Sequence, residues 1–88
     1  MQFHTTTLNN GESLTIARAD GAQMITVEPN SSSSATFLGN LPFKGNSPSA
    51  ITLDANQILT ISSSTPTSPL DGITVTCTSG TVDVVVGV

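Results

Sequence analysis

The clearest structural pattern in the chain lies in Ile73 to Val88, ITVTCTSGTVDVVVGV, where apolar side chains occupy every second position on both sides of Ser79-Gly80. Successive side chains of a strand point to opposite faces, so one face of each half is apolar. Gly80 can adopt the positive φ that a tight turn requires. The pattern predicts a β-hairpin in which Cys77 lies opposite Val82. Its apolar face would consist of Ile73, Val75, Cys77, Val82, Val84 and Val86.

The rest of the chain contains further short alternating segments separated by Asn, Asp, Gly and Pro. They predict strands at residues 2–8, 13–17, 23–28, 35–38, 50–53 and 57–62. The first three would form a meander with Phe3 facing inward, whereas residues 39–49 and 62–70 have the composition of loops. Turn signals every ~8–12 residues without helical periodicity are typical of all-β folds. We therefore expect one domain over residues 1–88, a small antiparallel β-sandwich or a jelly-roll-like barrel of about eight short strands.

The charge composition excludes some classes of partner. The 88 residues include only two basic ones, Arg18 and Lys44, and carry a formal net charge of -4. Binding to nucleic acid or to an anionic membrane needs clustered Lys and Arg, so we expect neither partner. Charged residues make up only 9% of the chain. The surface is then either a neutral, hydroxyl-rich β surface or one that a partner covers, since interface cores are poor in charge.

The chain offers few residues for chemistry. Cys77 is the only cysteine, so no intrachain disulfide can form, and its place in the apolar row predicts a buried thiol. His4 is the only histidine, and the carboxylates are scattered and mostly beside turns, which argues against a zinc or calcium site. No serine lies in a nucleophile motif such as G-x-S-x-G. We therefore expect no catalytic, metal-binding or cofactor-binding residues, and a protein that is not an enzyme.

The remaining kind of function is interaction with a partner. The segment Leu41-Pro42-Phe43-Lys44 combines apolar side chains, a rigid proline and a cation. Leu41 and Phe43 either close one end of the sandwich or anchor a partner. Met24 and Val85 lie on the face opposite the apolar rows of their strands, and a single exposed methionine can serve an interface. The candidate interface residues are Arg18, Met24, Leu41, Pro42, Phe43, Lys44, Val85 and Val88.

Two stretches, 50–61 (AITLDANQILTI) and 70–84 (LDGITVTCTSGTVDV), resemble in style small capsid decoration, or cement, proteins of tailed bacteriophages. The resemblance implies a structural protein on the capsid surface that binds the major capsid protein or other virion subunits at their junctions and braces the shell. It also implies a homo-oligomer, with a trimer favoured. The first residues lack the pattern of a signal peptide, and no apolar run is long enough to cross a membrane. With Met1 at the start, we expect synthesis in the host cytoplasm; the alternative is a mature form whose signal is missing.

The alternative is a carbohydrate-binding or adhesive β-sandwich that acts in receptor binding. It fits the fold class. The chain contains no Trp or Tyr on which sugar rings usually stack, and it has only three Phe.

Overall fold

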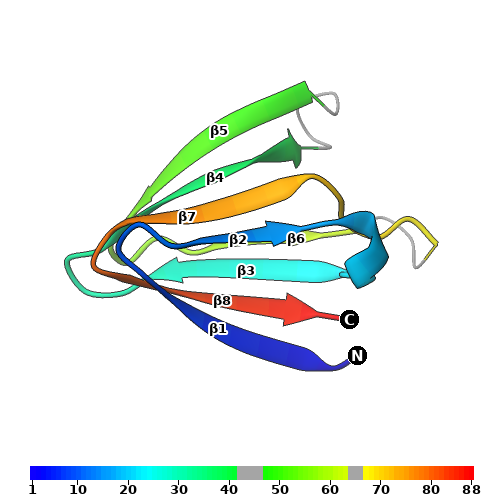
Figure 1. The fold of residues 1–88 in the computed structure, drawn as a ribbon, viewed down its shortest axis with the longest axis horizontal. Helices are drawn as coiled ribbons and strands as arrows, with labels where there is room; N and C mark the ends of the chain where they lie inside the picture. Colours follow the sequence, from blue (N-terminus) through cyan, green and yellow to red (C-terminus); the bar gives the residue numbers. More distant parts are fainter. Residues whose placement is uncertain (42–46, 64–66) are drawn as a thin grey trace.

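The computed structural model describes residues 1–41, 47–63 and 67–88, which form eight β-strands and one 3-10 turn at Arg18–Asp20 (Figure 1). The eight strands confirm the predicted all-β class. Their bounds are β1 (Phe3–Asn9), β2 (Ser13–Ile16), β3 (Met24–Pro29), β4 (Ser34–Leu41), β5 (Ser47–Asp54), β6 (Leu59–Ser62), β7 (Ile73–Ser79) and β8 (Thr81–Gly87).

The strands form two antiparallel sheets that pack face to face. One sheet has the order β1-β8-β3-β6 and is called the β8 sheet here, and the other has the order β2-β7-β4-β5 and is called the β7 sheet. The first strand pairs with the last, the second with the seventh, and so on inward to β4 and β5. This nested pairing is the jelly-roll topology of a rolled-up antiparallel ribbon. The sheets do not close into a barrel, so β1, β6, β2 and β5 are edge strands.

The prediction of a hairpin between Ile73 and Val88 is wrong, because β7 and β8 lie in opposite sheets. A hairpin and an arch between two sheets have the same alternation of side chains. Both also reverse the chain direction at Gly80, where φ is 72°. In a hairpin the single apolar face shared by both strands would need a cover from elsewhere in the chain. In the observed arch, the buried residues of β7, such as Val75, and those of β8, such as Val84, enter one core between the two sheets.

The predicted meander of the first three strands is also wrong, because β1, β2 and β3 alternate between the two sheets. Phe3 does not face inward: its side chain is 60% exposed, and the buried residue of β1 is Leu8. Alternation from Leu8 places His4 and Thr6 on the inner side of β1 and Phe3 on the outer side. Threonines at three successive positions concealed this phase in the sequence.

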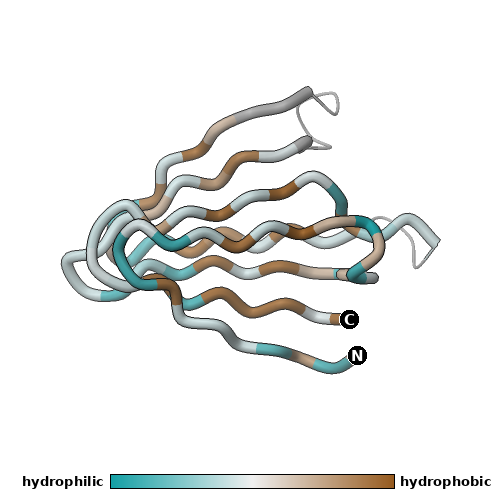
Figure 2. Tube along the Cα trace, in the orientation of Figure 1, coloured by the Kyte–Doolittle hydropathy of each residue, from teal (hydrophilic) through white to brown (hydrophobic). Residues whose placement is uncertain are grey.

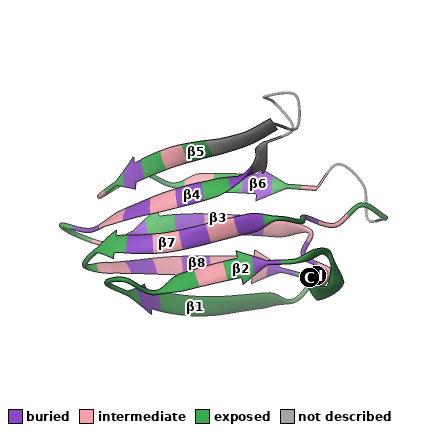
Figure 3. Ribbon diagram, turned by 45° about the horizontal axis from the view of Figure 1, so that its top comes forward, coloured by how far each residue is buried: buried purple, intermediate pink, exposed green. Residues whose placement is uncertain are grey.

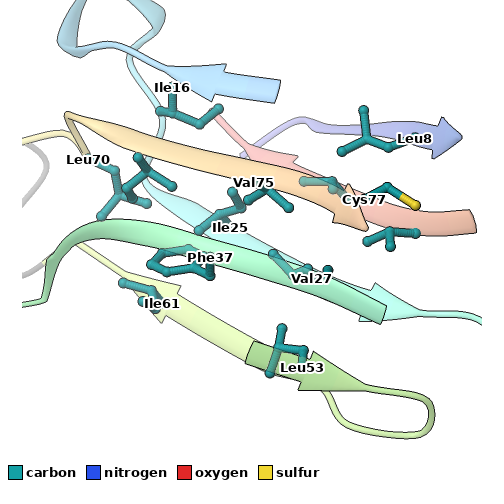
Figure 4. Close-up of a cluster of buried hydrophobic side chains, with 14 of the residues drawn as sticks. Leu8, Ile16, Ile25, Val27, Phe37, Leu53, Ile61, Leu70, Val75 and Cys77 are labelled. Atoms are coloured by element: carbon teal, nitrogen blue, oxygen red, sulfur yellow. The ribbon is translucent and has the colours of Figure 1, made fainter. Parts of the chain in front are cut away.

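The core lies between the sheets, and Phe37 is its largest fully buried side chain (Figure 4). Ile25 and Val27 of the β8 sheet and Val75 and Cys77 of the β7 sheet are also fully buried, which confirms the expected position of Cys77. Figure 2 shows the hydrophobic residues recurring along the strands, as alternation requires.

Strand structure reaches further into both ends of the predicted loop 39–49 than its composition suggested, since β4 extends to Leu41 and β5 begins at Ser47, and these two residues are paired. Gly39 lies where a Cβ atom would come within 3.0 Å of Ile73 Cγ1, so close packing explains this glycine. Pro48 lies in the edge strand β5, where a missing backbone donor is tolerated.

Candidate interaction surfaces

The described residues that bear reactive groups are not gathered into a centre. No three His, Cys, Asp or Glu side chains of the described ranges lie close enough together to hold a metal ion. The thiol of Cys77 is buried and donates a hydrogen bond to the carbonyl oxygen of Gly80 at 3.2 Å. His4 is exposed on β1.

The eight predicted interface residues fall into separate places. Arg18 is exposed in the 3-10 turn, where its backbone N–H donates to Asp71 Oδ1 at 3.0 Å and its Nη2 donates to the Thr67 carbonyl at 3.5 Å. Arg18 thus ties the turn to the segment before β7. Leu41 ends β4. The predicted residues Pro42, Phe43 and Lys44 lie outside the described residues.

Met24 and Val85 do share a surface, the outer face of the β8 sheet. Gly87 of β8 pairs with Phe3 of β1 on one side and with Met24 of β3 on the other, and Val85 lies one row further along. Met1 and Phe3 fold over Gly87, because a Cβ atom there would lie 2.6 Å from Met1 Sδ and 3.3 Å from Phe3 Cε1. Met1, Phe3, Met24 and Val85 therefore form one surface, here called the terminal apolar patch.

The terminal apolar patch is open to solvent at its outer side. Met1 is 71% exposed and Phe3 is 60% exposed, whereas Met24 and Val85 are partly buried. Val88 borders the patch, is 39% exposed and exchanges two backbone hydrogen bonds with Gln2, each of 2.8 Å. The sequence prediction missed Met1 and Phe3, which the phase of β1 relative to Leu8 could have revealed.

The outer face of the β8 sheet changes character along its strands. The row of Val85 continues into neutral residues, because Val85 pairs with Thr26, and Thr26 Oγ1 shares a hydrogen bond of 3.0 Å with Thr60 Oγ1. The next row pairs Asp83 of β8 with Glu28 of β3, so two carboxylates lie side by side. Thr7 Oγ1 donates to Asp83 Oδ1 at 2.7 Å. A partner suited to this face would present an apolar surface with a basic group beside it.

Strand β1 is an open edge at the margin of the molecule, with β5 at the opposite margin (Figures 1 and 3). Gln2 and Val88 bond to each other in both directions, so alternation along the ladder directs the backbone groups of His4, Thr6 and Leu8 toward β8. Those of Phe3, Thr5, Thr7 and Asn9 point away from the sheet. Glu12 satisfies Asn9, through Oε1 for its N–H at 2.7 Å and through its own N–H for the Asn9 carbonyl at 2.9 Å.

The remaining outward groups of β1 are open. No described residue bonds to the outward N–H and C=O groups of Phe3, Thr5 and Thr7. All side chains from Phe3 to Thr7 are exposed, including the two on the inner side of the strand. These backbone groups are called the β1 edge below.

The outer face of the β7 sheet is instead covered by hydroxyl groups that bond to one another. Ser13 Oγ and Thr76 Oγ1 lie 2.8 Å apart, and Ser34 Oγ and Thr78 Oγ1 lie 2.7 Å apart. A longer contact of 3.3 Å joins Thr15 Oγ1 to Thr74 Oγ1. Cross-strand bonding of this kind stabilises the sheet, and it satisfies the hydroxyl groups within the protein.

Comparison with known proteins found no match: neither protein-family models nor curated proteins nor solved structures resemble the chain significantly. Within the described ranges, no helix has the length and apolar character needed to cross a membrane.

Proposed function

We propose that this chain is a non-enzymatic structural protein of a virion, a capsid decoration protein that binds coat-protein junctions and stabilises the shell. The observation that carries the proposal is the terminal apolar patch, in which two side chains more than half exposed gather on the outer face of the β8 sheet. Exposed apolar side chains gathered at one place favour binding to another protein.

The fold supports this proposal by analogy. Jelly rolls with nested strand pairing occur in viral capsid domains, although they also occur in lectins and cupins. A fold hosts many functions, so the topology raises the expectation without assigning the role. The resemblance of residues 50–61 and 70–84 to decoration proteins points in the same direction.

The physical basis of binding would be burial of apolar area with little loss of charge hydration. Met1 and Phe3 would enter an apolar surface of the coat subunit, and Asp83 and Glu28 would face a basic group and fix the orientation. Apolar contacts supply most of the affinity, whereas charges at the rim supply direction and speed. Contacts with two neighbouring coat subunits would make the chain prefer assembled shells to free coat protein.

Co-sedimentation with purified shells tests the proposal, with coat protein taken from a gene neighbouring that of this chain. The native chain should pellet with shells and not with unassembled coat protein. Phe3→Ser combined with Met24→Ser should weaken pelleting at least tenfold. Leu38→Ser is the matched control, because Leu38 is 50% exposed on the outer face of the other sheet and should leave binding unchanged. A native chain that stays in the supernatant at micromolar shell concentrations would reject the function.

An adhesive or carbohydrate-binding module is the second candidate. One observation favours it: the exposed ring of Phe3 lies on the same face of β1 as the hydroxyls of Thr5 and Thr7. An exposed ring can stack on a sugar while neighbouring hydroxyls bond to it. Binding to a glycan array that is lost in Phe3→Ser, together with no binding to shells, would favour this candidate.

A further inference from the structure

We propose that two copies of this chain pair through their β1 edges, antiparallel and about a twofold axis at Thr5, so that their β8 sheets become one continuous sheet. This inference concerns the contact of the chain with itself and does not depend on the proposed function. It rests on the free backbone groups of β1, on its composition and on its position at the margin of the fold.

The free backbone groups of β1 are self-complementary. Phe3, Thr5 and Thr7 each direct one N–H and one C=O away from the sheet. With Thr5 opposite Thr5 of the second copy, Phe3 lies opposite Thr7, and each of the three pairs forms two N–H···O bonds. The N–H of Asn9 is already bonded to Glu12, which limits the pairing to these positions.

The other three edges suit this pairing less well. Strands β2 and β6 have only four residues each. In β5, Pro48 has no N–H to donate, and the N–H of Asp54 donates to Gln57 Oε1 at 2.7 Å. Strand β1 has seven residues, FHTTTLN, without proline, Lys, Arg, Asp or Glu. Edges are commonly protected against association by charge, proline or short length, and β1 has none of these.

The side chains permit a close approach. No like charges meet across the axis, because the strand carries no acidic or strongly basic residue. On the outer face, Phe3 would contact Thr7 of the second copy, which covers part of the exposed ring. On the inner side, His4 would lie opposite Thr6. Strand β1 lies at the outer margin of the fold, with its outward side free of other strands (Figures 1 and 3).

The pairing should be weak on its own. Three pairs of residues bury far less than the ~1,200–2,000 Å² of a standard interface, so we expect a dissociation constant of about 10–100 μM. Pairing would place both terminal apolar patches on one face of the joined sheet. Local concentration on a shared binding surface would then favour the pair.

Sedimentation equilibrium of the native chain from about 1 to 500 μM tests the association, with half dimer expected near the dissociation constant. Thr5→Pro removes the N–H at the axis and should keep the chain monomeric. The fold should survive, because that N–H has no partner within the chain. If the melting temperature of the Thr5→Pro variant is unchanged, its fold is intact, and any loss of dimer reflects the loss of pairing alone. A native chain that is monomeric throughout, a trimer, or a dimeric Thr5→Pro variant would each overturn the proposal.

Disulfide trapping tests the register. Thr5→Cys should form an intermolecular disulfide on mild oxidation, since opposed Cα atoms lie about 5.5 Å apart in a bonded pair and disulfides span such distances. Thr7→Cys is the matched control and should not crosslink with itself, because its copies would be more than ~10 Å apart. Cys77 can stay in place because it is buried. Equal crosslinking of both variants would contradict the twofold register.

Discussion

The hydroxyl group of Ser33 accepts a hydrogen bond from the backbone N–H of Thr81 at 3.0 Å and donates one to the Ser31 carbonyl at 3.2 Å. Ser33 is the buried polar side chain of the described residues. Asn30 adds a bond from its Nδ2 to Thr81 Oγ1 at 2.9 Å. The connection between β3 and β4 therefore clasps the arch between β7 and β8 and holds the two sheets together at this end.

Replacing Ser33 by Ala should lower the free energy of unfolding by about 1–3 kcal/mol, because the N–H of Thr81 would lose its acceptor in a partly buried place. Urea-induced unfolding followed by circular dichroism measures the loss. Ser31→Ala is the control: Ser31 is exposed and contributes its carbonyl, not its side chain, to the clasp. Equal free energies of unfolding for the two variants would show that the Ser33 hydroxyl does not stabilise the fold.

Gly80→Ala should be more harmful than the same change at Gly21. Both glycines have positive φ, 72° and 66°, where an alanine costs ~1–2 kcal/mol. A Cβ atom at Gly80 would also lie 3.0 Å from Ser33 Cβ and 3.2 Å from Ser33 Cα, whereas nothing lies within 4 Å of one at Gly21. We expect Gly80→Ala to cost at least about 1 kcal/mol more. The two melting temperatures measure the difference, and equal values would contradict the packing at Gly80.

Truncation of two phenylalanines should change the stability by very different amounts. Phe37→Ala should cost about 3–5 kcal/mol, because it leaves a cavity in the place of a fully buried ring. That loss is a large part of the total stability of a domain, commonly ~5–15 kcal/mol. Phe3→Ala should change stability by less than about 1 kcal/mol, since the ring is mostly exposed. Chemical denaturation of both variants measures this, and a large loss for Phe3→Ala would return that residue to the core.

The last residue of β1, Asn9, donates its backbone N–H to the side chain of Glu12. Glu12→Ala should lower the free energy of unfolding by about 0.5–1.5 kcal/mol, because Asn9 N–H would lose its bond. Glu12→Gln should retain most of it, since Gln57 forms the equivalent bond to Asp54 N–H at the end of β5. Thermal unfolding of the three chains gives the comparison. A Gln variant as unstable as the Ala variant would assign the effect to charge instead.

The residues of β7 and β8 that face the core could be predicted from the sequence, but the sheet to which each strand belongs could not. Alternation around Val75 and Val84 correctly placed both side chains in the core. It carried no information on whether their strands share hydrogen bonds, because period two is common to a hairpin and to an arch. The bonds that distinguish them come from distant partners: β7 pairs with β2 and β4, and β8 pairs with β1 and β3.

The candidate surface was predictable only in part. Met24 and Val85 stood out as apolar residues on otherwise polar strand faces, and they do share a surface. Phe3 was assigned to the core because aromatic residues are usually buried, whereas its phase relative to Leu8 places it outside. The open edge of β1 follows from sheet order alone, and sheet order is a long-range property that local patterns do not encode.

The nested strand order also has a consequence for folding during synthesis. During synthesis β1 emerges first, yet its partner β8 is the last strand of the roll. Until β8 has been synthesised, β1 has no strand with which to form hydrogen bonds, whereas β4 and β5 can pair as soon as both have left the ribosome. Contacts between such distant residues slow folding because the loop must close before they form. The roll should therefore close from its middle outward, and the strand with the open edge should be the last to find its place.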